Sequence, residues 1–95
     1  MRNFKQPKIW QKGFEIAVNS FKLTSTFPKE EKYGLTSQIT RSAVSVPSNI
    51  PEGSSRSSNK DYSRFIEISL GSSFELETQV LIADVANFGQ KKPGK

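Results

Sequence analysis

Ninety-five residues, 34% of them hydrophobic, suffice for one domain with a modest core, so residues 1–95 are expected to form a single domain that hides further apolar surface against a partner chain. The absence of cysteine and histidine excludes disulfides, thiolate metal sites and the commonest general base. No apolar run approaches the roughly 18 residues of a membrane span, and no signal-peptide core follows the basic start, so we expect a cytoplasmic protein without membrane contact.

The net charge of +5 is concentrated at the two ends of the chain. The basic residues of these ends have no acidic neighbour and are Arg2, Lys5, Lys8, Lys12, Lys91, Lys92 and Lys95. The ends therefore carry +7, whereas residues 13–90 hold seven basic and nine acidic side chains and carry −2. The basic ends favour an acidic partner such as nucleic acid, and the acidic middle favours a protein partner.

A first helix is predicted over about 7–24. Proline suits a first helical position, and two apolar lines recur at helical spacing. They are Trp10, Phe14, Ala17 and Phe21, with Ile9, Ile16 and Leu23 beside them. So broad an apolar surface is typical of a bundle helix that touches two neighbours.

A second helix is predicted over about 33–52. Its apolar stripe is Leu35, Ile39, Ala43, Val46 and Ile50. Pro47 lies inside this stripe, and a mid-helix proline costs roughly 3 kcal/mol, so we expect a kink at Pro47 that tertiary packing compensates. Pro51 opposes continuation, so the helix is expected to end either before it or near Glu52. Gly53 suits a left-handed helix terminus.

A third helix is predicted over about 59–88, with Ser58 and Asp61 as its capping pair and a basic tail at 89–95. One apolar line is Phe65, Ser69, Ser72, Leu76, Val80 and Ala83. The other is Ile66, Leu70, Phe74, Leu81, Val85 and Phe88. The first can serve its own chain and the second a neighbouring subunit, to which the small residues at 69 and 71–73 would allow close approach. A self-sufficient three-helix domain is the alternative to association.

The chain resembles a known family through an ordered series of short motifs. These are Trp10-Gln11-Lys12, Phe27-Pro28, residues 33–39 (YGLTSQI), residues 43–50 (AVSVPSNI), Glu52-Gly53, Gly71-Ser72 and residues 75–79 (ELETQ). Over most of residues 4–88 it is similar to the four-helix-bundle family of 23S rRNA intervening-sequence proteins, which are small bacterial helical proteins, some encoded within insertions in ribosomal RNA genes.

This resemblance implies an all-α fold, an antiparallel bundle of the four-helix type. The family's relatives include the accessory variability determinant of diversity-generating retroelements, a basic pentamer that works with a reverse transcriptase and nucleic acid, so a homo-pentamer is implied here. Two departures stand out. The fourth helix expected after Phe88 is missing, which is compatible with a natural truncation, a shortened chain or a change of frame, and Pro51 replaces the usual alanine.

The candidate nucleic-acid-binding residues outside the tail are Lys8, Lys12, Arg41, Arg56, Lys60 and Arg64. Lys60 and Arg64 share a helix face, and Arg56 lies on the preceding loop, so a phosphate backbone could lie across the three. Asp61 and Glu67 neutralise part of this patch. A solvated face with local ion pairs is therefore the competing interpretation.

Catalysis has little support in the sequence. Glu75 and Glu77 are two apart on a helix and cannot face each other, and Lys60 is the one base near the serines of residues 54–58. Phosphate-loop and dinucleotide motifs are absent, so we expect no enzyme, cofactor or metal. Trp10, Phe14, Tyr62 and Phe65 are expected in the core rather than as base-stacking platforms, and Phe4 is left open.

We therefore expect a non-enzymatic homo-oligomer that acts as a nucleic-acid-associated accessory or scaffold. The rival is a protein-binding adaptor that presents a helical oligomer surface to a partner enzyme, such as a reverse transcriptase, without touching nucleic acid. A hydrolase is the third and least supported class.

Overall fold

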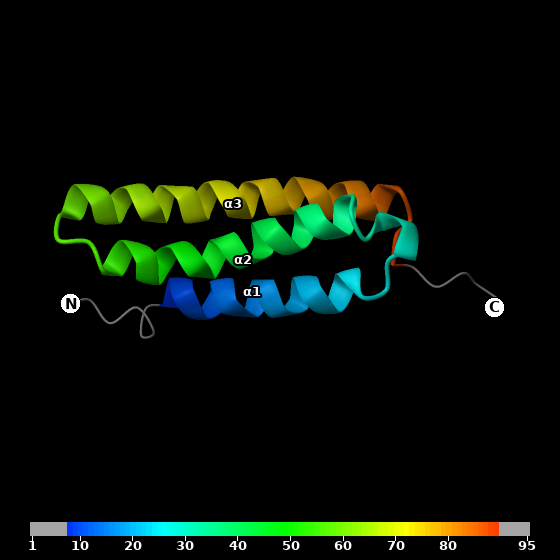
Figure 1. Cartoon of the computed structure of the whole chain (residues 1–95), viewed down its shortest axis with the longest axis horizontal. Coiled ribbons are helices and arrows are strands. Elements are labelled where there is room, and N and C mark those ends of the chain that lie inside the picture. Colours follow the sequence, from blue (N-terminus) through cyan, green and yellow to red (C-terminus); the bar gives the residue numbers. More distant parts are fainter. Residues whose placement is uncertain (1–7, 90–95) are drawn as a thin grey trace.

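The computed structural model describes residues 8–89, which form three α-helices and one short 3-10 helix without a strand (Figure 1). The helices are α1 (Lys8–Thr24), α2 (Leu35–Ser54) and α3 (Asn59–Val85), and η1 (Lys29–Glu31) lies between α1 and α2. The predicted all-α class is confirmed. No helix of these residues is long and apolar enough to cross a membrane.

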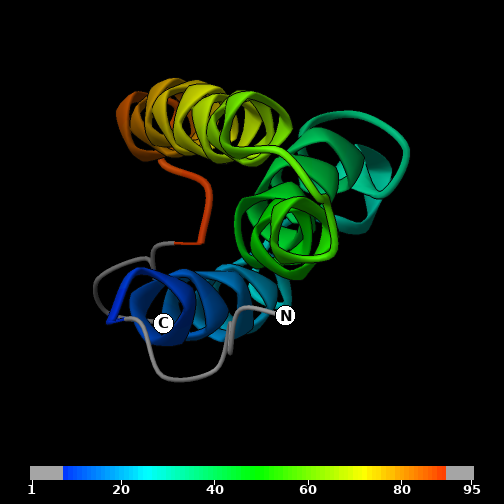
Figure 2. The same cartoon turned by 90° about the vertical axis from the view of Figure 1, so that its left-hand side faces the viewer.

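The helix α2 is the structural centre, because both other helices pack on it. Contacts join α1 to α2 and α2 to α3, but no Cα atom of α1 lies within 8 Å of one in α3. Seen end-on, α2 lies to one side of α1 and α3, and residues 86–89 run between those two (Figure 2). The α1–α2 and α2–α3 connections lie at opposite ends of the molecule (Figure 1).

A line of small residues brings α1 close to α2. The buried residues of α1 are Gly13, Ala17, Ser20 and Thr24, spaced four, three and four apart. A Cβ atom at Gly13 would lie 3.2 Å from Val46 Cγ1, so the two helices approach almost to backbone contact there. This packing contradicts the expectation that Phe14 lies in the core: its side chain is 52% exposed, because the small line faces α2 instead.

The apolar stripe of α2 is buried from Ile39 to Ile50, while Leu35 at its start is half-buried. Ile39, Ala43 and Ile50 are fully inaccessible, and Val46 nearly so. The helix continues through Pro47 and Pro51 and ends at Ser54, two residues later than predicted, and it also begins two residues later. Pro51 therefore does not shorten α2, while the kink at Pro47 stays a prediction.

Both ends of α3 have defined caps. The Asp61 amide donates to Ser58 Oγ at 3.1 Å, which confirms the predicted cap. At the other end Asn87 is left-handed (φ 63°), and the Phe88 and Asn87 amides donate to the carbonyls of Ala83 and Asp84. This Schellman arrangement stops α3 at Val85, three residues earlier than predicted. The rest of the predicted tail, 90–95, lies outside the described residues.

Gly53 has a different role from the one expected. It lies inside α2 and has no positive φ, so left-handed geometry is not its function. A Cβ atom there would lie 2.8 Å from Phe65 Cβ and 3.3 Å from the Tyr62 carbonyl oxygen. Gly53 is therefore needed for the close crossing of α2 and α3.

We predict that Gly53→Ala lowers the free energy of unfolding by about 1–3 kcal/mol, because the new methyl group overpacks this crossing. Gly71→Ala is the matched control: its Cβ would meet nothing within 4 Å, so the variant should gain about 0.5–1 kcal/mol from helix propensity. Urea unfolding measures both. Equal effects of the two substitutions would contradict the close approach at Gly53.

Candidate nucleic-acid interface

Three of the predicted cations gather where α2 meets α3. Arg56 lies in the connecting loop, and Lys60 and Arg64 lie in the first turns of α3. The guanidinium carbons of Arg56 and Arg64 stand 4.7 and 5.7 Å from the centre of the Phe65 ring. Cation–π contact holds both guanidinium groups at one aromatic ring. All three cationic side chains are exposed.

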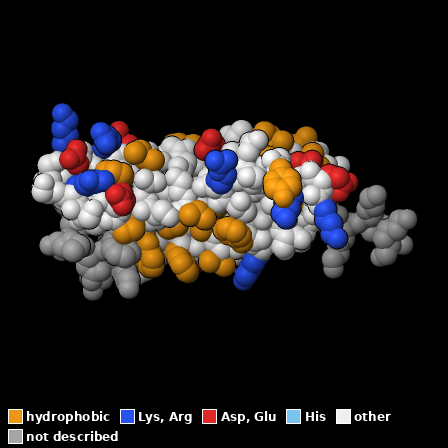
Figure 3. All heavy atoms as spheres, in the orientation of Figure 1, with side chains coloured by type: hydrophobic (Ala, Val, Ile, Leu, Met, Phe, Trp, Pro, Cys, Tyr) orange, Lys and Arg blue, Asp and Glu red, His pale blue; other side chains and the backbone are white. Residues whose placement is uncertain are grey.

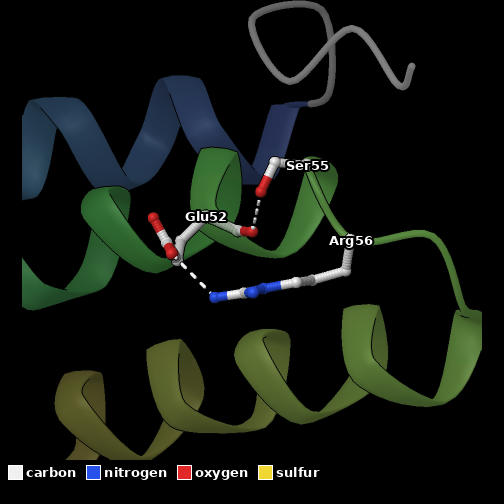
Figure 4. Close-up of polar contacts among 3 residues, drawn as sticks. All are labelled: Glu52, Ser55 and Arg56. Atoms are coloured by element: carbon white, nitrogen blue, oxygen red, sulfur yellow. Dashed lines mark hydrogen bonds and ion pairs between the residues drawn. The ribbon is translucent and has the colours of Figure 1, made fainter.

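An ion pair with Glu52 moderates this cluster. Arg56 Nη2 lies 2.8 Å from Glu52 Oε1, one helical turn earlier, while Ser55 Oγ donates to the Glu52 carbonyl oxygen at 2.7 Å (Figure 4). The two charged side chains are 41% and 56% exposed. An ion pair so exposed contributes about 0–1 kcal/mol, so a phosphate can compete for Arg56 at little cost.

The remaining predicted cations lie in two other places. Lys8 and Lys12 are exposed on the first turns of α1, whose start lies at the same end of the molecule as the α2–α3 loop (Figure 1). That end shows basic and acidic side chains interspersed, with hydrophobic ones lower on the same face over α1 (Figure 3). Arg41 is separate, because the 15 residues to Arg56 correspond to about 20 Å along a helix. Lys91, Lys92 and Lys95 lie outside the described residues.

Arg41 borders a polar cleft of about 340 Å³ between α2 and α3. The cleft is lined by Gln38, Arg41, Ser42, Ser45, Ser72, Glu75 and Gln79. Ser42 Oγ donates to Glu75 Oε1 at 3.1 Å, and the Ser45 and Ser72 hydroxyls lie 2.7 Å apart. One turn further, Ser69 Oγ donates to the Val46 carbonyl oxygen at 2.6 Å. A ladder of hydrogen bonds therefore joins the two helices.

This ladder corrects one expectation and adds residues that the sequence reasoning missed. Ser69 and Ser72 bond to α2 of their own chain, so they are not free for close approach to a neighbouring subunit. Gly71 remains exposed, and Ser73 lines a groove on the other side of α3. The missed signal was a polar line on α2, formed by Ser42, Ser45 and Asn49 at spacings of three and four.

An apolar groove runs between α1 and α3, with a volume of about 540 Å³. Its hydrophobic walls are Ile16 and Leu23 on α1 and Phe74, Leu76, Val80 and Leu81 on α3. Among residues 8–89, Glu77 is the one charged residue that lines it. Glu75 faces the polar cleft and Glu77 this groove, so the two carboxylates belong to different surfaces. Within residues 8–89, no group of three or more acidic side chains is placed to hold a metal ion.

Residues 5–94 match the family model described as 23S rRNA-intervening sequence protein, so the chain belongs to this family. The match confirms the resemblance seen in the motifs between Trp10 and Gln79. A comparison with curated proteins returned no match.

We predict that Gln79→Leu stabilises the fold by about 1 kcal/mol. Gln79 is 8% exposed, and its buried Oε1 has no hydrogen-bond partner within the described part of the chain, so replacing the amide with an apolar side chain removes an unsatisfied acceptor. Gln38→Leu, at the exposed rim of the same cleft, is the control and should change stability by less than about 0.5 kcal/mol. Thermal and urea unfolding measure the stability of both variants. A loss of stability in Gln79→Leu would contradict the interpretation that the Gln79 oxygen is an unsatisfied acceptor.

Proposed function

We propose that this member of the 23S rRNA-intervening sequence protein family is a non-enzymatic homo-oligomer that binds RNA or DNA phosphates as an accessory or scaffold factor. The observation that carries the proposal is the grouping of Arg56, Lys60 and Arg64 at one end of the molecule, with Lys8 and Lys12 at the same end. Phosphate binding by such side chains positions a nucleic acid without reading its sequence.

Two exposed apolar surfaces support assembly. On α1, Phe14, Val18 and Phe21 are 40–52% exposed and lie, by helical spacing, on the flank away from the groove. On α3, Ile82 and Val85 are 53% and 82% exposed and border a shallow hollow with Thr78, Leu81 and Ala86. Scattered apolar residues are ordinary at a surface, but contiguous patches on two helices favour burial against another chain.

The two surfaces lie on different helices, so a contact that joins α1 of one copy to α3 of the next would be heterologous. Heterologous contacts close into rings when the rotation per subunit allows it. The family resemblance implies five copies. A ring would also repeat the basic end around an axis, and the summed field of several modest patches attracts a polyanion more strongly than one patch does.

The rival function is a protein-binding adaptor without contact to nucleic acid. It is supported by the charge of −2 over residues 13–90 and by the acidic residues Glu52 and Asp61 beside the basic cluster. In this alternative the basic ends only keep the protein soluble, and a partner enzyme such as a reverse transcriptase recognises the helical surface.

We predict that the double variant Ile82→Glu with Val85→Glu lowers the particle mass in solution toward that of a single chain, because two carboxylates would be desolvated in the contact. Val44→Glu alone is the control, because Val44 is exposed on α2, outside the proposed contact. Adding Val18→Lys to it would also alter the α1 surface, so the control leaves Val18 unchanged. Light scattering over a concentration series measures the mass. A wild-type monomer at every concentration would overturn the assembly proposal.

We predict that Lys60→Ala with Arg64→Ala weakens binding of labelled single-stranded RNA and lowers the slope of log K against log salt by about 1.4, since each lost phosphate contact removes about 0.7. Lys29→Ala with Lys32→Ala makes the same charge change near η1, at the opposite end of the molecule, and should leave most of the affinity. Binding that is absent, or indifferent to salt, would leave the adaptor as the better function.

A further inference from the structure

The polar cleft between α2 and α3 contains a glutamine whose presence folding alone does not explain. Gln79 is 8% exposed, and its Oε1 is buried without a hydrogen-bond partner among residues 8–89. An unsatisfied acceptor costs stability, and proteins keep such costs chiefly at functional sites. The amide nitrogen of Gln79 also forms no hydrogen bond within these residues, but unlike the oxygen it is not buried. A molecule in the cleft can therefore reach this nitrogen.

Hydrogen-bond donors gather at one end of the cleft. The ladder steps from Ser45–Ser72 to Ser42–Glu75, three residues back on α2 and three forward on α3. The next step in the same direction reaches Gln38 and Gln79, four residues further along each helix, and both line the cleft.

Arg41 lines the cleft beside these two amides. A guanidinium group and the two amide nitrogens present N–H donors, and guanidinium binds a carboxylate through two parallel hydrogen bonds. This end of the cleft is suited to a carboxylate.

The other end of the cleft presents acceptors. The buried Ser42 hydroxyl donates to Glu75 Oε1 at 3.1 Å, which orients the carboxylate and leaves its second oxygen to accept from a ligand. Arg41 and Glu75 line the same cleft, but within the described part of the chain no ion pair joins them. A positive and a negative group thus border one space without neutralising each other.

We infer that the polar cleft binds a free α-amino acid with a small side chain. The ligand carboxylate would lie at Arg41 and the Gln79 amide nitrogen, and the ammonium group at Glu75. An α-amino acid carries both charges on one carbon, which suits groups that lie one helical turn, about 5.4 Å, apart along α3. The volume of about 340 Å³ is at the low end for ligand pockets, so the ligand is small. The inference goes beyond the proposed function, because it uses neither the basic end nor the exposed apolar surfaces.

The test is isothermal titration calorimetry of the full chain with L-alanine and two analogues. N-acetyl-L-alanine lacks the ammonium group, and L-alanine amide lacks the carboxylate. Each analogue should bind about 10- to 100-fold more weakly than L-alanine, because each loses one set of charge-assisted hydrogen bonds.

Charge variants locate the binding. Arg41→Gln and Glu75→Gln should each weaken L-alanine binding about tenfold or more, because each removes one charge from the cleft. Arg64→Gln and Glu67→Gln remove the same charges from exposed positions of α3 outside the cleft, and should leave Kd unchanged. Circular dichroism confirms that each variant folds.

Gln79→Leu separates binding from stability. This variant is expected to be more stable than the wild type, so weaker binding cannot be attributed to unfolding. Loss of the amide nitrogen should weaken L-alanine binding about tenfold. A glutamine with a purely structural role would leave the Kd for L-alanine unchanged.

Three results would overturn the inference: no binding of L-alanine, equal affinity for L-alanine and either analogue, or an unchanged Kd in Gln79→Leu. Equal affinity for an analogue would mean that the cleft recognises a lone carboxylate or a lone ammonium group. Failure of the proposed function would appear elsewhere, in the RNA titration of the Lys60 and Arg64 variants and in the particle mass.

Discussion

The continuity of α2 through its two prolines is the constraint on which the rest of the structure depends. Pro47 and Pro51 lack the amide that would have bonded the carbonyls of Ala43 and Pro47, and each costs about 3 kcal/mol in a helix interior. Complete burial of Ile39 and Ile50 returns about 1.5–3 kcal/mol per side chain. The Ser69 hydroxyl, bonded to the Val46 carbonyl oxygen beside Pro47, ties α3 to the same turn. Tertiary packing thus maintains a helix that local propensity opposes.

Because α2 is shared, α1 and α3 are separated from each other, and this determines the surfaces of the molecule. Polar side chains such as Ser42, Ser72 and Glu75 lie on the α2–α3 side, where they bond across the interface. Apolar side chains such as Ile16, Phe74 and Leu81 lie on the α1–α3 side, where no third helix covers them among the described residues. The same arrangement that buries the stripe of α2 leaves the groove open.

The sequence predicted those parts of the fold that depend on hydrophobic periodicity and local capping. The stripe from Ile39 to Ile50 is buried, and the Ser58 cap is present, because both are encoded within a few turns. Hydrophobic periodicity did not predict which side of α1 packs on α2. The residues that contact α2 include Gly13, Ala17 and Ser20, which are small and give almost no hydrophobic signal, and the aromatic Phe14 beside them is exposed. The role of Gly53 was also missed, since a close crossing with Phe65 involves residues twelve apart in the chain.

The candidate site likewise has some features that local sequence predicts and others that depend on contacts between helices. The approach of Arg56 and Arg64 could be predicted because a short loop joins them, and the structure places both at Phe65. The polar cleft and the apolar groove could not be predicted, because each is formed by side chains from two helices. The groove lies on the side of α3 opposite the polar cleft, and the cations gather at the end of the molecule where α2 meets α3. A polyanion bound at this basic end would therefore leave the apolar groove uncovered, because the two surfaces lie on different parts of the molecule.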